Sequence, residues 1–123
     1  MDASNIKILN DQVTGQAYIL SNLKNGENSI IIVGAANQAY KQFAPDWHDI
    51  IKKVDILILQ MEIPQSVNIE AARLAKESGK IVIMDLGGKD EPVEKNILQY
   101  LDYISPNQTE LTKIFGADFA NVA

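Results

Sequence analysis

From residue 46 onward, short apolar runs rich in β-branched residues alternate with segments of helical spacing, and this alternation constrains the fold most strongly. Apolar residues recur at helical intervals after Pro64 and again after Pro92, and Gly79 offers a left-handed end to the first of these helices. The runs between the helices have strand length and cover residues 55–60, 80–84 and 102–105. Strands and helices that alternate in this way form βαβ units with parallel strands.

Two further helices complete this part of the chain. Asp46 is placed to cap a short helix that contains Trp47, and a last helix is expected over residues 107–115, ended by Gly116. The strand at 55–60 is almost continuously apolar, which predicts that both of its faces are covered. The pattern therefore predicts an α/β protein with a parallel sheet over residues 46–123.

The segment 15–33 has the pattern of an antiparallel hairpin. In a strand over 15–23, Ala17, Ile19, Ser21 and Leu23 lie on one side and Tyr18 and Leu20 on the other, and a β-branched return strand follows over 29–33. Asn25-Gly26 lies between them and predicts the turn, because both residue types tolerate positive φ. Two strands alone are only marginally stable in water, so this hairpin is expected to lie on something else.

The composition limits the partners and the location. The 123 residues are enough for one domain, and 11 Lys and Arg against 16 Asp and Glu, without a basic run, argue against nucleic-acid binding. Cysteine is absent, which excludes disulfides and thiolate metal sites and fits a cytoplasmic protein. No apolar run reaches the roughly 18 to 20 residues of a membrane helix, and no export signal is recognised, so no membrane association is expected.

Polar residues follow each of the three predicted parallel strands. Glu62 comes after the first strand, Asp85 after the second, and Asn107 and Glu110 after the third. Because ligands of open parallel sheets bind beyond the carboxyl ends of the strands, these residues are candidates for one binding site at one edge.

Each of these candidates also has an interpretation that needs no ligand. Glu62 is either a first-turn glutamate favoured by the helix dipole or a carboxylate that accepts hydrogen bonds from a polyol. Asp85 is either a turn former or a site acid. Asn107 and Glu110, three residues apart at a helix start, resemble a capping box with Asn in place of Ser or Thr. The residues alone leave these alternatives open.

Other catalytic motifs are missing. His48 is the single histidine and is expected to be solvated, because it lies on a short helix with a polar face; catalysis is not expected, because no paired base or nucleophile accompanies it. Gly87-Gly88-Lys89 lacks the first Gly and the Ser or Thr of a P-loop, and no Gly-x-Gly-x-x-Gly occurs. A Walker-type ATPase and a dinucleotide-binding Rossmann domain both lose support.

Several short segments agree in composition, order and spacing with one known family; they are residues 14–19, 26–31, 34–37, 60–64, 71–75 and 105–110. Together they resemble the ribokinase members of the PfkB carbohydrate kinase family, over nearly the whole chain. The resemblance implies an α/β sandwich in which 15–33 forms part of a β lid over the sugar and 46–123 supplies βα units of the core. Residues 1–123 would then form a partial ribokinase-like domain.

The resemblance also implies a reaction and its participants. The family transfers the γ-phosphate of ATP to a sugar hydroxyl, here D-ribose to ribose 5-phosphate, with Mg²⁺. Glu62 matches the glutamate that contacts the sugar hydroxyls, and Asn107 and Glu110 match an Asn-x-x-Glu motif that organises Mg²⁺ and the phosphates, with Glu110 toward the metal. A carboxylate beside polyphosphate needs such a cation. Asp85 stands near the phosphates, where bacterial ribokinases more often have Asn, and 86–88 departs from their Pro-containing loop.

Two family motifs have no counterpart in the chain: the N-terminal Gly-Gly sugar-binding motif and the C-terminal Gly-Ala-Gly-Asp motif with the catalytic base. The base is not Asp85, Asp90 or Asp118, because none has that context. We therefore expect the central piece of a kinase, inactive alone, that forms a homodimer through the hairpin or associates with the missing segments. The alternatives are a non-catalytic binding or assembly module with the same fold, and an unrelated flavodoxin-like domain, against which the hairpin argues.

Overall fold

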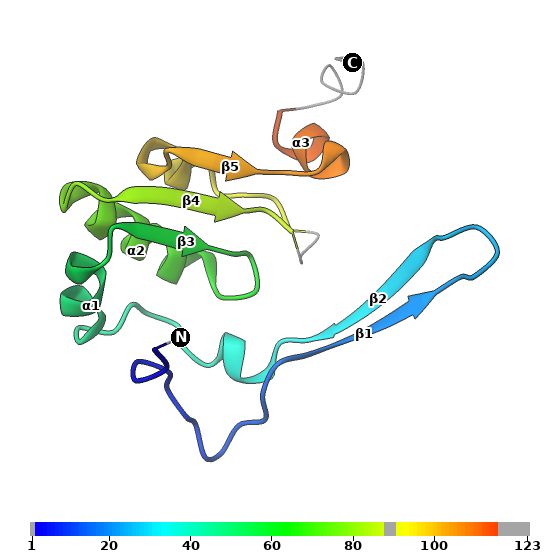
Figure 1. Cartoon of the computed structure of the whole chain (residues 1–123), viewed down its shortest axis with the longest axis horizontal. Coiled ribbons are helices and arrows are strands. Elements are labelled where there is room, and N and C mark those ends of the chain that lie inside the picture. Colours follow the sequence, from blue (N-terminus) through cyan, green and yellow to red (C-terminus); the bar gives the residue numbers. More distant parts are fainter. Residues whose placement is uncertain (1, 88–90, 116–123) are drawn as a thin grey trace. The chain divides into compact units, whose positions relative to one another are not determined.

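Two units make up the chain, Met1–Ala39 and Tyr40–Ala123. The computed structural model, drawn in Figure 1, describes residues 2–87 and 91–115. Gly88, Asp90, Gly116 and Asp118, on which sequence expectations fell, lie outside the described residues.

The first unit is built on an antiparallel hairpin. Strand β1 (Gln16–Ser21) pairs with β2 (Asn28–Val33) so that Gln16 lies opposite Val33 and Ser21 opposite Asn28 (Figure 1). Every residue of both strands is exposed. The two strands are confirmed, and both faces of the hairpin present apolar side chains to solvent, among them Tyr18, Ile19, Ile30 and Ile31.

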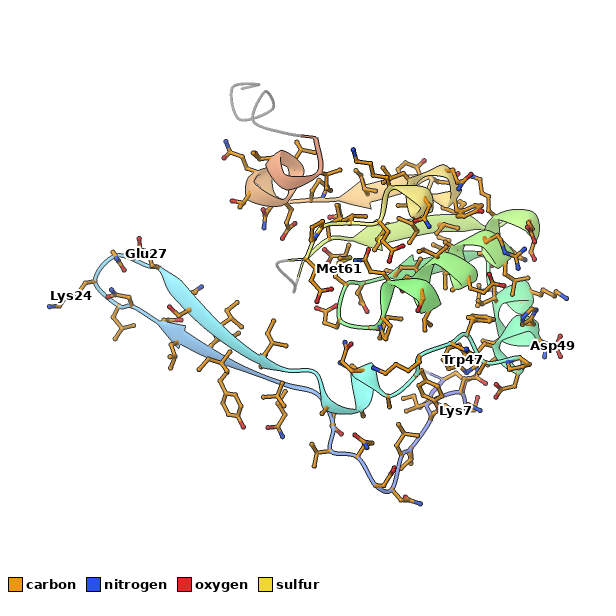
Figure 2. All side chains as sticks on the ribbon, turned by 180° about the vertical axis from the view of Figure 1, so that it is seen from behind. Lys7, Lys24, Glu27, Trp47, Asp49 and Met61 are labelled. Atoms are coloured by element: carbon orange, nitrogen blue, oxygen red, sulfur yellow. The ribbon has the colours of Figure 1, made fainter. Side chains whose placement is uncertain are left out.

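The turn of the hairpin is wider than the expected two-residue Asn25-Gly26 turn. The Asn22 N–H donates to the Glu27 carbonyl at 2.8 Å, and the Gly26 N–H donates to the Asn22 carbonyl at 2.9 Å, so residues 23–26 form the loop. Among the non-glycine residues described, only Ala35 has positive φ, so Asn25 does not adopt the left-handed conformation; Gly26 does, with φ +74°. The Asn25 side chain instead donates to the Glu27 carboxylate, near the tip seen in Figure 2.

The base of the hairpin is closely packed. A Cβ on Gly15 would come within 2.8 Å of the Asn37 side-chain nitrogen and 2.9 Å of the Gly34 carbonyl oxygen. A 3₁₀ helix, η1 (Ala35–Gln38), follows, and the Ala36 N–H donates to the Val13 carbonyl at 3.0 Å. Only glycine at position 15 allows this approach.

The second unit contains a parallel three-stranded sheet in the order β3-β4-β5, which confirms the predicted parallel arrangement. Its strands are β3 (Ile56–Leu59), β4 (Ile81–Asp85) and β5 (Tyr103–Ser105). Leu59 lies opposite Met84, and Asp85 opposite Ser105, so the carboxyl ends of the strands are level along one edge (Figure 1).

The hydrophobic core lies on one face of this sheet. Helix α2 (Gln65–Glu77) packs on β3, β4 and the 3₁₀ helix η2 (Lys95–Tyr100) on that side. The buried side chains include Leu59, Met61, Ala71, Ala72, Leu74, Ala75, Val82, Met84, Leu86 and Ile97. Small residues on α2 let the helix approach the strands closely.

No described element of the second unit covers the opposite face of the sheet, so the expectation that both faces of the first strand are covered is wrong. Ile58 is 63% exposed, and Ile56, Ile81 and Tyr103 are also exposed, while Ile83 is half-buried. Because side chains alternate along a strand and these residues are paired in register, they share one face, which we call the open sheet face. The apolar run was correctly identified as a strand, but the described helices pack only on its other side.

Helices α1 (Trp47–Lys53) and α2 begin and end near the residues that the sequence indicated. Pro64 precedes α2, and Gly79 ends it with φ +70°, as predicted. Helix α1 begins after Asp46, but the Asp46 side chain makes no capping hydrogen bond because its backbone already has helical angles. In the described ranges, no helix is long and apolar enough to cross a membrane.

The helix expected to begin at Pro92 is shorter and of a different type. It is the 3₁₀ helix η2, which begins only at Lys95. Gln65 accounts for the delay: its Nε2 donates to the Pro92 carbonyl at 2.9 Å and its Oε1 accepts from the Glu94 N–H at 2.8 Å. Residue 94 is held with ψ 115°, which is extended and not helical.

An aromatic cluster flanks α1. The rings of Tyr40 and Phe43 meet Trp47 edge-on at 5.0 and 5.2 Å, and Phe43 also meets the His48 ring at 5.2 Å. His48 is therefore half-buried in ring contacts, not simply solvated as expected. Trp47, also half-buried, contacts the Tyr40 and Phe43 rings at the start of the helix.

Candidate functional site at the carboxyl edge of the sheet

The four candidate residues follow the carboxyl ends of the three parallel strands. Glu62 lies in the loop between β3 and α2, Asp85 is the last residue of β4, and Asn107 and Glu110 come after β5. The three strand arrows in Figure 1 point the same way, so these loops leave the sheet at one edge. The topology places all four candidates where ligands of parallel sheets bind.

Asp85, Gly87 and Glu110 are close neighbours. The Gly87 N–H donates to Asp85 Oδ1 at 3.0 Å. A Cβ on Gly87 would lie 3.4 Å from Asp85 Oδ1 and 3.9 Å from Glu110 Oε1, so Gly87 passes between two carboxylates that come from β4 and from helix α3 (Gln108–Phe115). A side chain at position 87 would therefore extend between the two carboxylates.

Asn107 and Glu110 form a complete reciprocal capping box. Glu110 Oε2 accepts from the Asn107 backbone N–H at 2.7 Å, and Oε1 accepts from Asn107 Nδ2 at 2.7 Å. In return, Asn107 Oδ1 accepts from the Glu110 N–H at 2.9 Å. The capping interpretation of this pair is therefore correct in the structure, and it fixes both side chains at the start of α3.

The loop that carries Glu62 is held on both sides. Met61, labelled in Figure 2, is only 1% exposed and is part of the core. Glu62 itself is half-buried, with its Oε2 shielded from solvent. Pro64 then begins α2. A carboxylate displayed on such a short, anchored loop is suited to accept hydrogen bonds in a defined direction.

The residues at this edge fit a magnesium ion that is bound together with phosphates. Mg²⁺ is usually held by one or two carboxylates, with water and substrate phosphates completing its shell. Asp85 and Glu110 supply two carboxylates, and Gly87 leaves the space beside them free of a side chain. In the described part of the chain, no three His, Asp or Glu side chains gather into a ready-made metal site, so phosphates and water would supply the remaining ligands.

Charged groups away from this edge brace the helices. Arg73 on α2 bridges Glu70 at 2.5 Å and Glu77 at 2.6 Å, and this lowers the pKa of Glu70 and raises that of Arg73. Asp102 pairs with Lys76 and accepts a hydrogen bond from the Val82 N–H at 2.9 Å. Both contacts lower the pKa of Asp102, and the contact with Lys76 has the larger effect. This second pair ties α2 to the segment before β5.

Three residues that organise the edge were missed by the sequence analysis: Gln65, Asn68 and Gly87. Gln65 binds residues 92 and 94, Asn68 binds the Gln60 carbonyl, and Gly87 separates two carboxylates. Asn68 did have a signal, since it is a polar residue at a position of α2 whose helical neighbours are apolar. Gly87 was expected beside Asp85 after the second strand, but its position between two carboxylates was not predicted.

Comparison with known proteins identifies the class that this fold and edge define. The family model of the pfkB family carbohydrate kinases matches residues 1–123. The chain therefore belongs to the pfkB family of carbohydrate kinases, as the sequence resemblance indicated.

Within this family, the chain is similar to ribokinases. It is 40% identical over 113 residues to a ribokinase of Arabidopsis thaliana and 36% identical over 119 residues to a bifunctional ribokinase/ribose-5-phosphate isomerase A of Fructilactobacillus sanfranciscensis. These matches cover 90% and 96% of the chain but 30% and 22% of the two relatives, so the chain spans about a third or less of their length.

Solved structures agree with this placement. The structure of Arabidopsis thaliana ribokinase complexed with ribose and ATP matches with a TM-score of 0.76 at 40% identity, over 87% of this chain and 35% of that one. A ribokinase from Giardia lamblia matches with a TM-score of 0.77 at 23% identity, over 92% and 36% of the two chains, and supports the fold.

Proposed function

We propose that this chain forms the central part of an ATP-dependent kinase that phosphorylates ribose. The observation that carries the proposal is the placement of Asp85, Gly87 and Glu110 at one sheet edge, next to the strand that leads to Glu62. Family membership and the similarity to a ribokinase that binds ribose and ATP support it.

Glu62 is the sugar-binding residue in this proposal. A carboxylate accepts hydrogen bonds from two neighbouring hydroxyls of a pentose, and such charge-assisted bonds are stronger than neutral ones. Partial burial of Glu62 on an anchored loop restricts the directions in which it can accept. Its role is to orient the sugar so that one hydroxyl faces the nucleotide.

Asp85, Asn107 and Glu110 serve the nucleotide side. Magnesium, when bound with ATP, neutralises phosphate charge, and Glu110 with Asp85 would hold it through oxygen or water ligands. Asn107 fixes the Glu110 carboxylate through two hydrogen bonds and so orients it toward the edge. In the transfer, a sugar oxygen bonds to the γ-phosphorus, the bond to the ADP oxygen breaks, and the hydroxyl proton leaves to a base.

That base is not among the residues of this chain in our proposal. Asp85 accepts the Gly87 N–H and is assigned to the nucleotide side in this proposal, and no other aspartate of the chain stands in the motif expected for the base. The chain alone is therefore expected to bind its substrates without transferring phosphate. We place the kinase in the cytoplasm, where ATP is present and thiols are kept reduced.

The hairpin is the proposed contact with a second copy and part of a lid over the sugar. All of its strand residues are exposed, including apolar ones on both faces. Light scattering should report a dimer, and replacing Ile31 and Ile19 with Ser should shift it to a monomer. A monomer in the unmodified protein, at concentrations well above micromolar, would overturn the contact.

The sugar role is tested in a completed kinase, made by joining this chain in frame to the N- and C-terminal segments of the Arabidopsis ribokinase. Glu62→Gln should raise the KM for ribose by about 10- to 100-fold, because hydrogen bonds to a charged group are lost. Glu77→Gln, which changes a carboxylate bound to Arg73, is the matched control and should leave KM unchanged. Ribose binding without phosphorylation would instead favour a non-catalytic module.

The metal role is tested in the same completed kinase. Glu110→Gln should raise the Mg²⁺ concentration needed for half-maximal rate by about tenfold, since a neutral amide is a poorer magnesium ligand. The KM for ribose should stay near that of the unmodified enzyme. An unchanged magnesium requirement would remove Glu110 from this role.

A further inference from the structure

Asn68 is the one polar side chain that is fully buried among the described residues, with 0% exposure. We propose that Asn68 is a positioning residue for the Glu62 loop (residues 60–64) and thereby for sugar binding. The link to the sugar rests on the function proposed above, whereas the contact itself does not.

The contact joins the helix to the loop at its first residue. Asn68 Nδ2 donates to the Gln60 carbonyl oxygen at 2.6 Å. The orientation of the amide is fixed by chemistry, because turning it over would place its oxygen against another oxygen. Asn68 therefore acts through its two N–H groups, of which one reaches Gln60.

The Gln60 carbonyl lies just beyond the end of a strand, where the Asn68 side chain donates to it. Strand β3 ends at Leu59, and the last paired position of the β3–β4 ladder is Leu59 opposite Met84. Gln60 lies between Leu59 and Met61, whose side chains are both buried. Gln60 itself is exposed, but its carbonyl lies beyond the last pair of the ladder and beside two buried side chains, and the Asn68 amide supplies a fixed donor to it there.

The result is a loop fixed at three points around Glu62. Asn68 holds the backbone at Gln60, Met61 inserts into the core, and Pro64 has the fixed φ that starts α2. Glu62 stands between the second and third of these points. Because a carboxylate two residues from a fixed carbonyl has little backbone freedom, the loop presents it in one direction.

Packing alone does not explain asparagine at this position. The Asn68 Oδ1 atom is buried and has no hydrogen-bond partner within residues 2–87 and 91–115, which is unfavourable for stability. A leucine, whose side chain has the same number and branching of heavy atoms, would avoid that cost on a face formed by Val67, Ala71, Ala72 and Leu74. The hydrogen bond that Asn68 donates to the loop therefore explains asparagine at this position better than packing does.

The first test uses this chain and nuclear magnetic resonance. In Asn68→Leu, the backbone order parameters at Met61, Glu62 and Ile63 should fall from about 0.85 to below about 0.6, while those of α2 and β4 stay high. Val67→Ala is the matched control, since it removes buried volume beside Asn68 without touching the Gln60 carbonyl. If Asn68→Leu does not fold, Asn68→Ala provides the same loss of the donor.

The second test uses the completed kinase and separates sugar from nucleotide. Asn68→Leu should raise the KM for ribose by about tenfold through the loosened loop, with the KM for ATP within about twofold of the unmodified value. Val67→Ala should change neither constant. A general loss of structure would instead affect both substrates.

The outcomes decide between the two levels of the proposal. A loop that stays ordered in both Asn68 variants overturns the positioning role. A disordered loop with an unchanged KM for ribose overturns its link to the sugar. If the completed kinase does not phosphorylate ribose at all, the proposed function fails, and the order parameters still decide whether Asn68 holds the loop.

Discussion

The hairpin and the three-stranded sheet are both made of short, β-branched strands, yet they are stabilised in different ways. Strands β1 and β2 are exposed at every residue, so backbone pairing and the close contact at Gly15 hold them. Strands β3 and β4 instead place alternate residues under α2, where Val82 and Met84 are fully buried. Strands of similar composition therefore form a sheet whose stability depends on burial and a hairpin whose stability does not.

The comparison teaches where the stability of the chain resides. Buried apolar area is the main source of folding free energy, and in the described residues it is concentrated in the second unit. The hairpin exposes apolar side chains and gains little from burial within the chain. Substitutions of the same kind should accordingly have different effects in the two regions.

The largest difference is expected for matched truncations in strands. Met84→Ala removes a fully buried side chain and should lower the free energy of unfolding by about 3 kcal/mol. Ile31→Ala, in a strand exposed within the chain, should lower it by less than about 0.5 kcal/mol when measured at a concentration low enough to dissociate the proposed dimer. Urea denaturation of both variants measures the difference, and equal losses would show that the hairpin contributes to the same core.

A second test concerns the base of the hairpin. Gly15→Ala places a Cβ against the Gly34 carbonyl, which cannot move without shifting the backbone, and should destabilise the hairpin by about 1 to 3 kcal/mol. Cross-strand nuclear Overhauser effects between β1 and β2 should weaken, while the resonances of the second unit remain. Loss of structure in both units would contradict their separate stability.

Two glycines offer a closely matched pair. Gly26 and Gly79 have φ of +74° and +70°, and a Cβ at either position would meet nothing within 4 Å. Alanine at each site therefore pays the same cost of left-handed backbone, about 1 kcal/mol. Gly79→Ala should lower the global unfolding free energy by that amount, whereas Gly26→Ala should change only the population of paired hairpin, measured by amide exchange.

The smallest expected effect is the change in stability at acidic pH. Contacts with Lys76 and the Val82 N–H lower the pKa of Asp102 from its usual 3.8. The ionised Asp102 therefore contributes to folding stability above pH 3.8, and this contribution is lost as the pH falls through the lowered pKa. Asp102→Asn should flatten the decline in Tm between neutral pH and about pH 3. Hairpin resonances serve as the internal reference, and an unchanged acid profile would exclude this contribution.

Much of the architecture could be predicted from the sequence because local signals and the chain order agree. The alternation of strands and helices implied parallel pairing, and parallel pairing implied that Glu62, Asp85 and Asn107 follow strand ends at one edge. Gly79 was predictable as a helix end because few residues tolerate its φ.

The errors share a cause, which is tertiary contact that no local pattern records. Gln65 holds residues 92 and 94 and delays the helix after Pro92 to Lys95. Exposure of Ile58 depends on which helices pack on the sheet, and the apolar run could not report that. At the site, the pair Asn107 and Glu110 was visible because its spacing is local, whereas Asn68 and Gln60 are joined only by the fold.

The open sheet face has a consequence for the thermodynamics of unfolding. Denaturant slopes and heat-capacity changes scale with the surface that unfolding exposes, and apolar surface dominates the heat-capacity change. Ile56, Ile58, Ile81 and Tyr103 are already in contact with solvent in the folded chain, as are the hairpin residues. Both quantities should therefore be smaller than chain length alone would give, and the stability curve of this chain should be correspondingly flat with temperature.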